Sequence, residues 1–221
     1  MCGRYTLRVP VEELAEKFDL PGPLPELSPS YNIAPSREVA AVVLREKTRR
    51  LEKFRWGLVP SWADDPGIGN RMINARAESV AEKPSYRRAF RSRRCLVLAD
   101  GFYEWRKEDG GRQPYYIKMR DGSPFAFAGL WEVWRGGADE IRSCTIITTD
   151  ANGLLAPIHE RTPVILDPEE YDLWLDVSVH DPDVLLPLLK PYEGETLEAY
   201  PVDRLVNNPA NDGPACVEPV G

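Results

Sequence analysis

Apolar and polar residues alternate along this chain with two different periods, which predict a strand-rich protein with short helices towards both ends. Apolar positions at helical spacing, near a proline that suits a first turn, predict an amphipathic helix over residues 9–18. Segments 167–175 and 181–190 each begin Asp-Pro before an apolar periodic run, which is typical of a helix start. A further short helix is expected over residues 85–92.

The middle of the chain contains most of the expected strands, separated by turns that contain Gly and Asp. The strand-like segments are 38–44, 51–59, 95–105, 113–119, 124–134 and 143–149. Prolines exclude a helix over residues 20–36 and indicate a loop, and the Gly, Pro and Asp of 60–70 indicate another. Runs of strands with helices at the beginning and end predict an α+β fold, because a doubly wound sheet needs alternating strands and helices. We expect a single domain over 1–221, with an irregular tail over about 204–221.

The composition is that of an ordinary globular protein, at 43% hydrophobic and 29% charged residues. No run approaches the roughly 18 apolar residues of a membrane span, and the amino terminus is too acidic for a signal peptide. We therefore expect no membrane partner and a cytoplasmic location, or a nuclear one in a eukaryote. We also expect a monomer. The four cysteines are scattered and there are only two histidines, which argues against a structural zinc site, a disulfide framework and any metal cofactor.

Charge is unevenly distributed along the chain, although the net charge is -7. The segment from Arg71 to Arg94 holds eight Lys or Arg against two Glu, a local balance of +6, so the remainder carries -13. An acidic protein with one basic segment can still present a confined positive groove to phosphates, because the local field steers a polyanion. The alternative is a solvated helix face with no ligand.

The chain begins "MCGRYTL", so removal of Met1 would leave Cys2 with a free amine and a thiol on adjacent carbons. A terminal amine has a pKa of about 7.7 to 8.0 and is partly neutral at pH 7. Such an amine can attack an aldehyde to give an imine, and the thiol can then close a five-membered thiazolidine ring. The same pair could instead perform nucleophilic acyl transfer. The alternative is a cysteine in a frayed terminus with no role.

Glu104 lies in "CLVLADGFYEW", among aromatic residues and just after an apolar strand. Poor solvation raises the pKa of such a carboxyl and suits it to general acid or base work. The alternative is an exposed glutamate on an edge strand.

Three other segments contain candidate side chains, each with a structural alternative. His159 in "IHERTPV" is a potential proton shuttle or a structural histidine. Asn74 in "INARAES" is a candidate because it lies near the head of the basic segment, and the alternative is that it belongs to an ordinary loop. In "RWGLVPSWA" we expect Trp56 in the core, whereas Trp62 is either buried or a stacking platform for unpaired bases.

The segments "MCGRYTL", "YNIAPS", "RWGLVPSWA", "INARAES", "CLVLADGFYEW" and "IHERTPV", in this order, resemble the SRAP family of SOS response-associated peptidases, or abasic-site-processing proteins. The resemblance runs from Met1 to about Val164, and "VNNP" at 206–209 is similar as well. It implies a compact α+β domain around a curved, partly barrel-like β structure with a positively charged channel. It also implies binding of single-stranded DNA and a covalent attachment to abasic sites that protects these lesions.

The resemblance implies roles for individual residues as well. The catalytic residues would be Cys2, Asn74, Glu104 and His159. The DNA contacts would be Arg4, Asn32, Trp62, Arg76 and Arg161. One departure is visible, because some members carry two adjacent tryptophans where this chain has Trp62 followed by Ala63.

Two further functions fit parts of the sequence. "MCG" also opens class II glutamine amidotransferases, whose cysteine attacks a glutamine amide, but this chain is too short for their synthetase domain. A DNA-binding module without catalysis is the other. The family name further implies a peptidase activity, which we treat as secondary together with a lyase activity, since a single-residue Met1 leader needs no self-cleavage.

Overall fold

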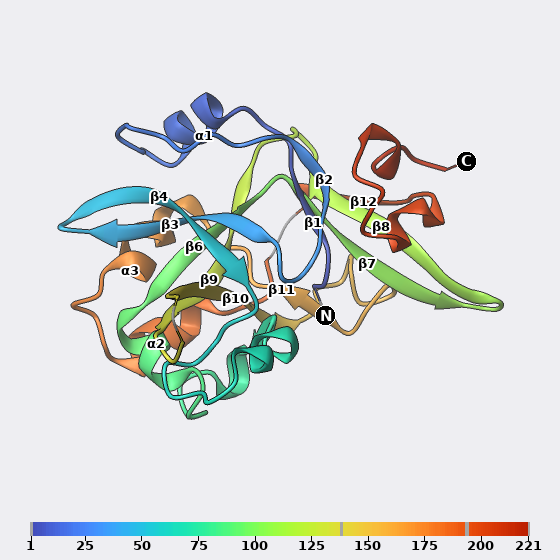
Figure 1. The fold of residues 1–221 in the computed structure, drawn as a ribbon. Coiled ribbons are helices and arrows are strands. Elements are labelled where there is room, and N and C mark those ends of the chain that lie inside the picture. The colour runs from blue at the N-terminus through green and yellow to red at the C-terminus, as the bar shows by residue number, and fades with distance from the viewer. Residues whose placement is uncertain (1, 138, 193–194, 221) are drawn as a thin grey trace.

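The computed structural model describes residues 2–137, 139–192 and 195–220, and within these ranges strands form two sheets with short helices around them (Figure 1). The strands are β1 (Tyr5–Leu7), β2 (Ser30–Ile33), β3 (Glu38–Arg45), β4 (Thr48–Trp56), β5 (Asn74–Arg76), β6 (Arg94–Ala99), β7 (Gly101–Glu108), β8 (Gly111–Met119), β9 (Phe125–Trp134), β10 (Ile141–Asp150), β11 (Arg161–Pro163) and β12 (Leu197–Pro201). The α-helices are α1 (Val11–Lys17), α2 (Arg87–Ser92), α3 (Tyr171–Leu175) and α4 (Pro182–Leu185). None of these described helices has the length and apolar character needed to cross a membrane.

The larger sheet closes on itself. Its strand order is β11-β10-β4-β3-β6-β9, and β9 also pairs with β10, so five of its strands form a ring. β4 and β5 each run parallel to β10, whereas the other pairs are antiparallel. Closure leaves fewer unpaired strand edges than an open sheet has. This architecture confirms the expected α+β class with a curved, partly barrel-like core.

The smaller sheet has β1, its first strand in the chain, in its interior. Its order is β12-β8-β7-β1-β2, so β1 is hydrogen-bonded to β7 on one side and β2 on the other. The β7–β8 hairpin extends away from the body of the molecule in Figure 1. Cys2 lies three residues before β1, and the pairing of β1 therefore determines where it is held.

Aromatic side chains fill the space where β1 meets the larger sheet. The Tyr5 ring packs edge-on against Trp56 at 5.3 Å and Phe127 at 5.8 Å between centroids, and Phe102 packs against Phe127 at 5.8 Å. All four side chains are completely buried. The expected core position of Trp56 is confirmed.

A buried polar network fixes the register of β1. The Thr6 hydroxyl donates to the Asp100 carboxylate and lies 2.8 Å from the Tyr116 hydroxyl, while the Arg8 backbone N–H donates to Asp100 at 2.8 Å. A β-carbon on Gly101 would meet the Tyr116 hydroxyl oxygen at 2.0 Å. A glycine is therefore required here for Tyr116 to reach Thr6.

Four of the expected elements differ in detail from the structure. The loop expected over 20–36 contains β2, because residues 30–33 pair with β1 despite the prolines around them. The strand expected over 95–105 is broken at Asp100, whose side chain accepts the hydrogen bonds just described. The strand expected over 51–59 is β4, which ends at Trp56, before the glycine that follows it. The loop expected over 60–70 contains a 3-10 turn, Pro66–Arg71.

The elements near the ends of the chain are mostly short. The three-residue strands β1, β5 and β11, and the five-residue β12, were not expected. Helices do begin where the Asp-Pro segments predict them, although proline at 187 confines the second to a four-residue turn before a 3-10 turn. Residues 204–220 form short turns beside the smaller sheet.

Substitution of Gly101 by Ala tests how tightly the network holds β1. The added methyl group must displace the Tyr116 ring, so we expect the free energy of unfolding in urea to fall by about 1–3 kcal/mol. Gly153→Ala is the matched control, because a β-carbon there meets nothing within 4 Å, and its effect should stay within about 0.5 kcal/mol. Equal effects of the two substitutions would show that the close approach of Tyr116 to Gly101 does not contribute to the stability of the fold.

Candidate active site

Cys2 is a buried side chain in this structure, with none of its surface exposed. Burial raises the pKa of its thiol above the ordinary value, and the neighbouring Glu104 carboxylate raises it further, while the Arg4 backbone N–H donates to the sulfur. A thiol in this environment stays protonated at neutral pH. The protein therefore holds Cys2 as a neutral thiol and does not store it as a thiolate.

Glu104 reaches the Cys2 region because β7 pairs with β1. Tyr5 lies opposite Phe102, and the Tyr103 backbone N–H donates to the Arg4 carbonyl at 3.0 Å. Side chains alternate along a strand, so Glu104 shares the inward face of Phe102. It is 2% exposed on a central strand, and burial raises its pKa to about 7. The expected rise in pKa is confirmed, and an exposed edge position is wrong.

Asn74 lies at the start of β5, opposite Ile146 of β10. Its side-chain nitrogen donates to the Ile73 carbonyl at 3.1 Å, and its backbone carbonyl accepts from the Tyr86 hydroxyl at 3.1 Å. The side-chain oxygen is buried and accepts no hydrogen bond from the described part of the chain. An unmet acceptor of this kind can take an N–H or O–H from a ligand.

A chain of contacts links Asn74 to β1, the strand that follows Cys2. Tyr5 packs on Trp56, and the Trp56 ring nitrogen donates to the Ile73 carbonyl at 2.9 Å, one residue before Asn74. Trp56 was expected in the core, but its hydrogen bond to the Ile73 carbonyl was not expected. Nothing in the sequence shows which backbone carbonyl a buried indole N–H will find.

His159 is half-buried in the segment between β10 and β11. The Arg161 backbone N–H donates to His159 Nδ1 at 2.9 Å, and the Arg161 carbonyl oxygen lies farther from the same nitrogen, at 3.2 Å. The closer contact favours the neutral tautomer that carries its proton on Nε2. Burial lowers the pKa of His159, which favours this neutral form. The ring can therefore donate from Nε2 at neutral pH.

Arg161 ties the His159 segment to the Asn74 segment. Its guanidinium pairs with Glu78 at 2.6 Å and Asp150 at 2.7 Å and donates to the Thr148 carbonyl at 2.7 Å. Only 10% of the Arg161 side chain is exposed. β5 and β11 both pair with β10, and the Arg161–Glu78 ion pair joins β11 to the turn that follows β5.

The remaining residues expected to contact DNA fall into two groups. Trp62 is 59% exposed, in a loop anchored where Trp134 donates to the Ala63 carbonyl at 2.6 Å, and Arg76 is also exposed. Arg4 and Asn32 have structural bonds instead. These two residues hold the carboxyl-terminal segment against the smaller sheet, through Arg4 to Val206 at 2.8 Å and Asn32 to Asn211 at 2.7 Å. All five remain predicted DNA contacts.

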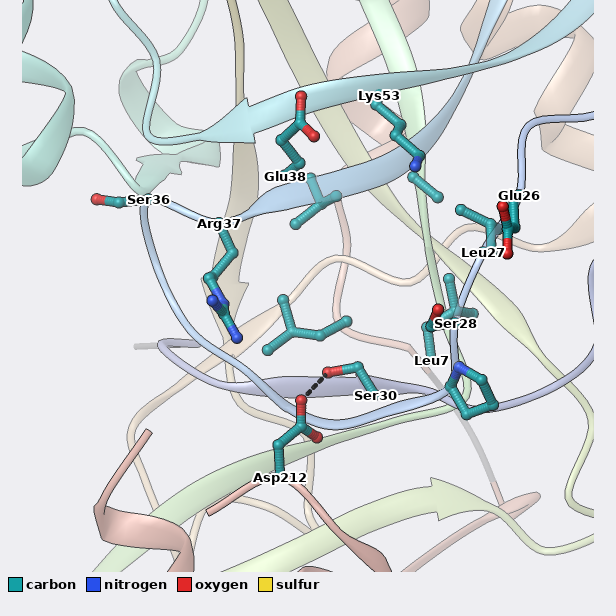
Figure 2. A pocket seen from close by; sticks show the side chains of 14 residues that line it. Leu7, Glu26, Leu27, Ser28, Ser30, Ser36, Arg37, Glu38, Lys53 and Asp212 are labelled. Atoms are coloured by element: carbon teal, nitrogen blue, oxygen red, sulfur yellow. Dashed lines mark hydrogen bonds between the residues drawn. The ribbon is translucent and has the colours of Figure 1, made fainter. Parts of the chain in front are cut away.

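A separate groove of about 730 Å³ lies between the 26–29 segment, β2 and the start of β3. Figure 2 shows its charged side chains, with Ser30 bonded to Asp212 at 2.9 Å. Its lining contains three carboxylates against Arg37 and Lys53 and has neither cysteine nor histidine. This groove therefore lacks the cysteine nucleophile of the Cys2 region, and its carboxylates outnumber its cations. Within the described residues, no group of three potential metal ligands occurs anywhere.

Comparison with known proteins places the whole arrangement in a family. Residues 1–209 match the model of the SOS response associated peptidase (SRAP) family. The chain belongs to the SRAP family. The resemblance of the six segments is thereby confirmed.

Several relatives of this SRAP chain are similar over nearly its whole length. It is 46% identical to the abasic site processing protein YoqW of Bacillus subtilis, over 99% of both chains. It is 33% identical to the abasic site processing protein HMCES of Gallus gallus, over 87% of this chain and 66% of that one. A crystal structure of a protein from Bacteroides thetaiotaomicron superposes with a TM-score of 0.88 at 28% identity, covering 99% of this chain and all of the other.

The raised pKa of Glu104 makes stability depend on pH. The folded protein binds this proton more tightly than the unfolded chain, so the free energy of unfolding falls as the pH rises from about 4.5 to about 7. Glu104→Gln removes the buried charge, and we expect it to be more stable than the wild type at pH 8 by up to about 3 kcal/mol, with a much smaller difference at pH 4.5. Urea unfolding at the two pH values measures this.

Glu108→Gln is the matched control for that measurement, because Glu108 lies on the same strand but is partly exposed and paired with Arg106. Its effect should stay within about 0.5 kcal/mol at both pH values. A Glu104→Gln protein that gains no stability at pH 8 would contradict the assignment of a poorly solvated carboxyl.

Proposed function

We propose that this protein attaches itself covalently to abasic sites in single-stranded DNA through Cys2. The observation that carries the proposal is the burial of the Glu104 carboxyl near the Cys2 thiol. Burial gives this carboxyl a pKa of about 7, so near neutral pH it can donate or accept a proton close to a nucleophile. The names of its relatives support the lesion as substrate, since they are abasic site processing proteins. The product is a thiazolidine that shields the lesion.

The reaction begins with the removal of Met1, which lies outside the described residues. Removal leaves the Cys2 nitrogen as a primary amine, which is partly neutral near pH 7. An abasic deoxyribose is mostly a closed hemiacetal, whose ring-opened form exposes an aldehyde at C1′. Glu104 promotes this opening by taking the proton of the C1′ hydroxyl and delivering a proton to the ring oxygen as its bond to C1′ breaks, which requires both protonation states of Glu104 near neutral pH.

Two bond-forming steps follow. The Cys2 amine adds to C1′ and the resulting carbinolamine loses water, with the proton for the leaving hydroxyl supplied by Glu104, to give an imine. The Cys2 sulfur then bonds to C1′ while its proton passes to the nitrogen, which closes the ring. The overall change releases one water. A protonated thiol suits this last step, because addition to an imine consumes both the sulfur and its proton.

Asn74 and His159 position the opened sugar. The unmet side-chain oxygen of Asn74 accepts from the Cys2 amine or a sugar hydroxyl, and His159 donates from Nε2 to the hydroxyl end of the opened sugar. Arg76 neutralises a flanking phosphate, and Trp62 stacks on an unpaired base. Arg161, Arg4 and Asn32 contribute mainly by holding these segments, since most of their polar atoms are already bonded.

Intact mass after incubation with an abasic strand tests the covalent step. We expect the wild type, without Met1, to gain the mass of the strand less one water and to keep it on heating. Cys2→Ala retains the amine, so it should gain a stable strand only when borohydride reduces the imine. Cys216→Ala is the matched thiol control and should behave as the wild type does, because Cys216 lies in the carboxyl-terminal segment.

Two results would overturn this function. One is a wild type that gains no mass although Met1 has been removed, and the other is a Cys2→Ala protein that forms the same heat-stable adduct without borohydride. Release of ammonia from labelled glutamine in the absence of DNA would point instead to amidotransferase chemistry.

The pH dependence of adduct formation tests Glu104 directly. The wild-type rate should change slope near pH 7, where the Glu104 carboxyl titrates. Glu104→Gln should slow adduct formation by about 100-fold or more and remove this change of slope. Glu108→Gln should retain both the rate and the profile. A Glu104→Gln profile that still bends near pH 7 would assign the titration to another group.

A further inference from the structure

A hollow lies on α2, within the basic segment of the chain, and its lining contains none of the catalytic candidates. It measures about 620 Å³ and is lined by Arg87, Arg88, Arg91, Ser92 and His180. All five side chains are exposed, and the lining contains no carboxylate. In a protein of net charge -7, this is a concentrated patch of positive charge.

The charges of the three arginines are not neutralised by any carboxylate among the residues that the structure describes. Within the described part of the chain, no ion pair involves Arg87, Arg88 or Arg91. Arg87 and Arg91 are four residues apart on one helix face, where like charges repel and destabilise the helix. An anion bound between them would remove this cost. The hollow therefore has the charge and spacing of an anion site.

A buried arginine, Arg94, holds together the two segments that form the hollow. The Arg94 side chain, 1% exposed overall, donates to the carbonyls of Phe90 at 2.7 Å and Arg91 at 2.8 Å at the end of α2, and to that of Val179 at 3.0 Å. Burial lowers the pKa of Arg94 to about 10, so it remains charged at neutral pH. His180 Nδ1 donates to the Arg91 carbonyl at 3.0 Å. The 176–180 segment is thereby held against the helix.

The hollow also has a direct connection to the candidate active site. Tyr86 immediately precedes α2, and its hydroxyl donates to the backbone carbonyl of Asn74 at 3.1 Å. One tyrosine side chain therefore spans from the start of the arginine helix to the strand that bears Asn74 and Arg76. A DNA strand leaving Arg76 could meet Arg87 within a few nucleotides.

We propose that the α2 hollow, formed by Arg87, Arg88, Arg91 and His180, binds phosphates of the DNA strand beyond the abasic nucleotide. This proposal rests on the function proposed above and adds a second contact that only a sufficiently long strand can reach. The hollow contributes affinity and takes no part in the chemistry. A phosphodiester backbone fits it better than a single anion does, because it presents charges in a row to arginines on successive helix positions.

The test compares strand lengths with a probe that cannot react. Fluorescence anisotropy would measure binding of strands of about 5 and about 20 nucleotides, each with a tetrahydrofuran analogue of the abasic site, over a range of KCl concentrations. The variant is Arg87→Gln/Arg88→Gln/Arg91→Gln. The matched control is Lys17→Gln/Lys47→Gln/Arg50→Gln, which removes the same charge from exposed positions on other elements.

We expect the α2 variant to bind the long strand at least about tenfold more weakly at low salt, with the salt slope reduced by about 1.4 to 2.1 for two or three lost phosphates. Binding of the short strand should be unchanged, as should adduct formation on a short abasic strand at saturation. The control should bind both strands as the wild type does.

Three outcomes would overturn the proposal: an equal loss on both strands, an equal loss in the control, or weaker binding of inorganic phosphate with DNA affinity intact. The last would assign the hollow to a small anion. Because the probe has no aldehyde, these measurements do not depend on the Cys2 reaction. A wild type that binds the long strand through α2 but forms no adduct would defeat the proposed function alone.

Discussion

Burial of the Glu104 carboxyl within electrostatic range of the Cys2 thiol is the constraint around which the rest of the site is organised. A carboxyl that ionises readily in water and a thiol that ionises less readily are both buried, which raises the pKa of each. This arrangement is unfavourable for folding and persists because β1 is paired on both sides and bonded to Asp100 through Thr6. The stability of the smaller sheet thus keeps Cys2 and Glu104 buried.

The same requirement explains why several polar residues that resemble DNA contacts have internal bonds here. Arg4 and Asn32 hold the 206–211 segment against β1 and β2, and Arg161 joins β10 to the segment after β5. A site assembled from distant parts of a chain needs charged side chains as ties between those parts. Trp62 and Arg76 face solvent and are the residues of this set that a ligand can reach without displacing an existing bond.

The sequence predicted the long strands and the helix starts because these depend on local signals such as alternation and Asp-Pro pairs. It did not predict β2 among prolines, or β5 and β11 with three residues each, because these strands exist only through their partners. The poor solvation of Glu104 could be inferred from residue types, and the same kind of reasoning led to the proposed role of Cys2. Their proximity could not, since β1–β7 pairing brings together positions 102 residues apart.

The positive side chains near the Cys2 region differ from those on α2 in how far their charge is neutralised by neighbouring groups. Positive side chains near the site, such as Arg4 and Arg161, are bonded to carboxylates or carbonyls and contribute little net attraction for a polyanion. Those on α2 face solvent without carboxylates in the hollow that they line, so their field is not cancelled locally. A chain that is acidic overall can therefore present a positive field at α2 while Cys2 and Glu104 stay buried elsewhere. A strong positive field and the poor solvation that raises the pKa of Glu104 would oppose each other if they occupied the same position, because nearby positive charge lowers the pKa of a carboxyl.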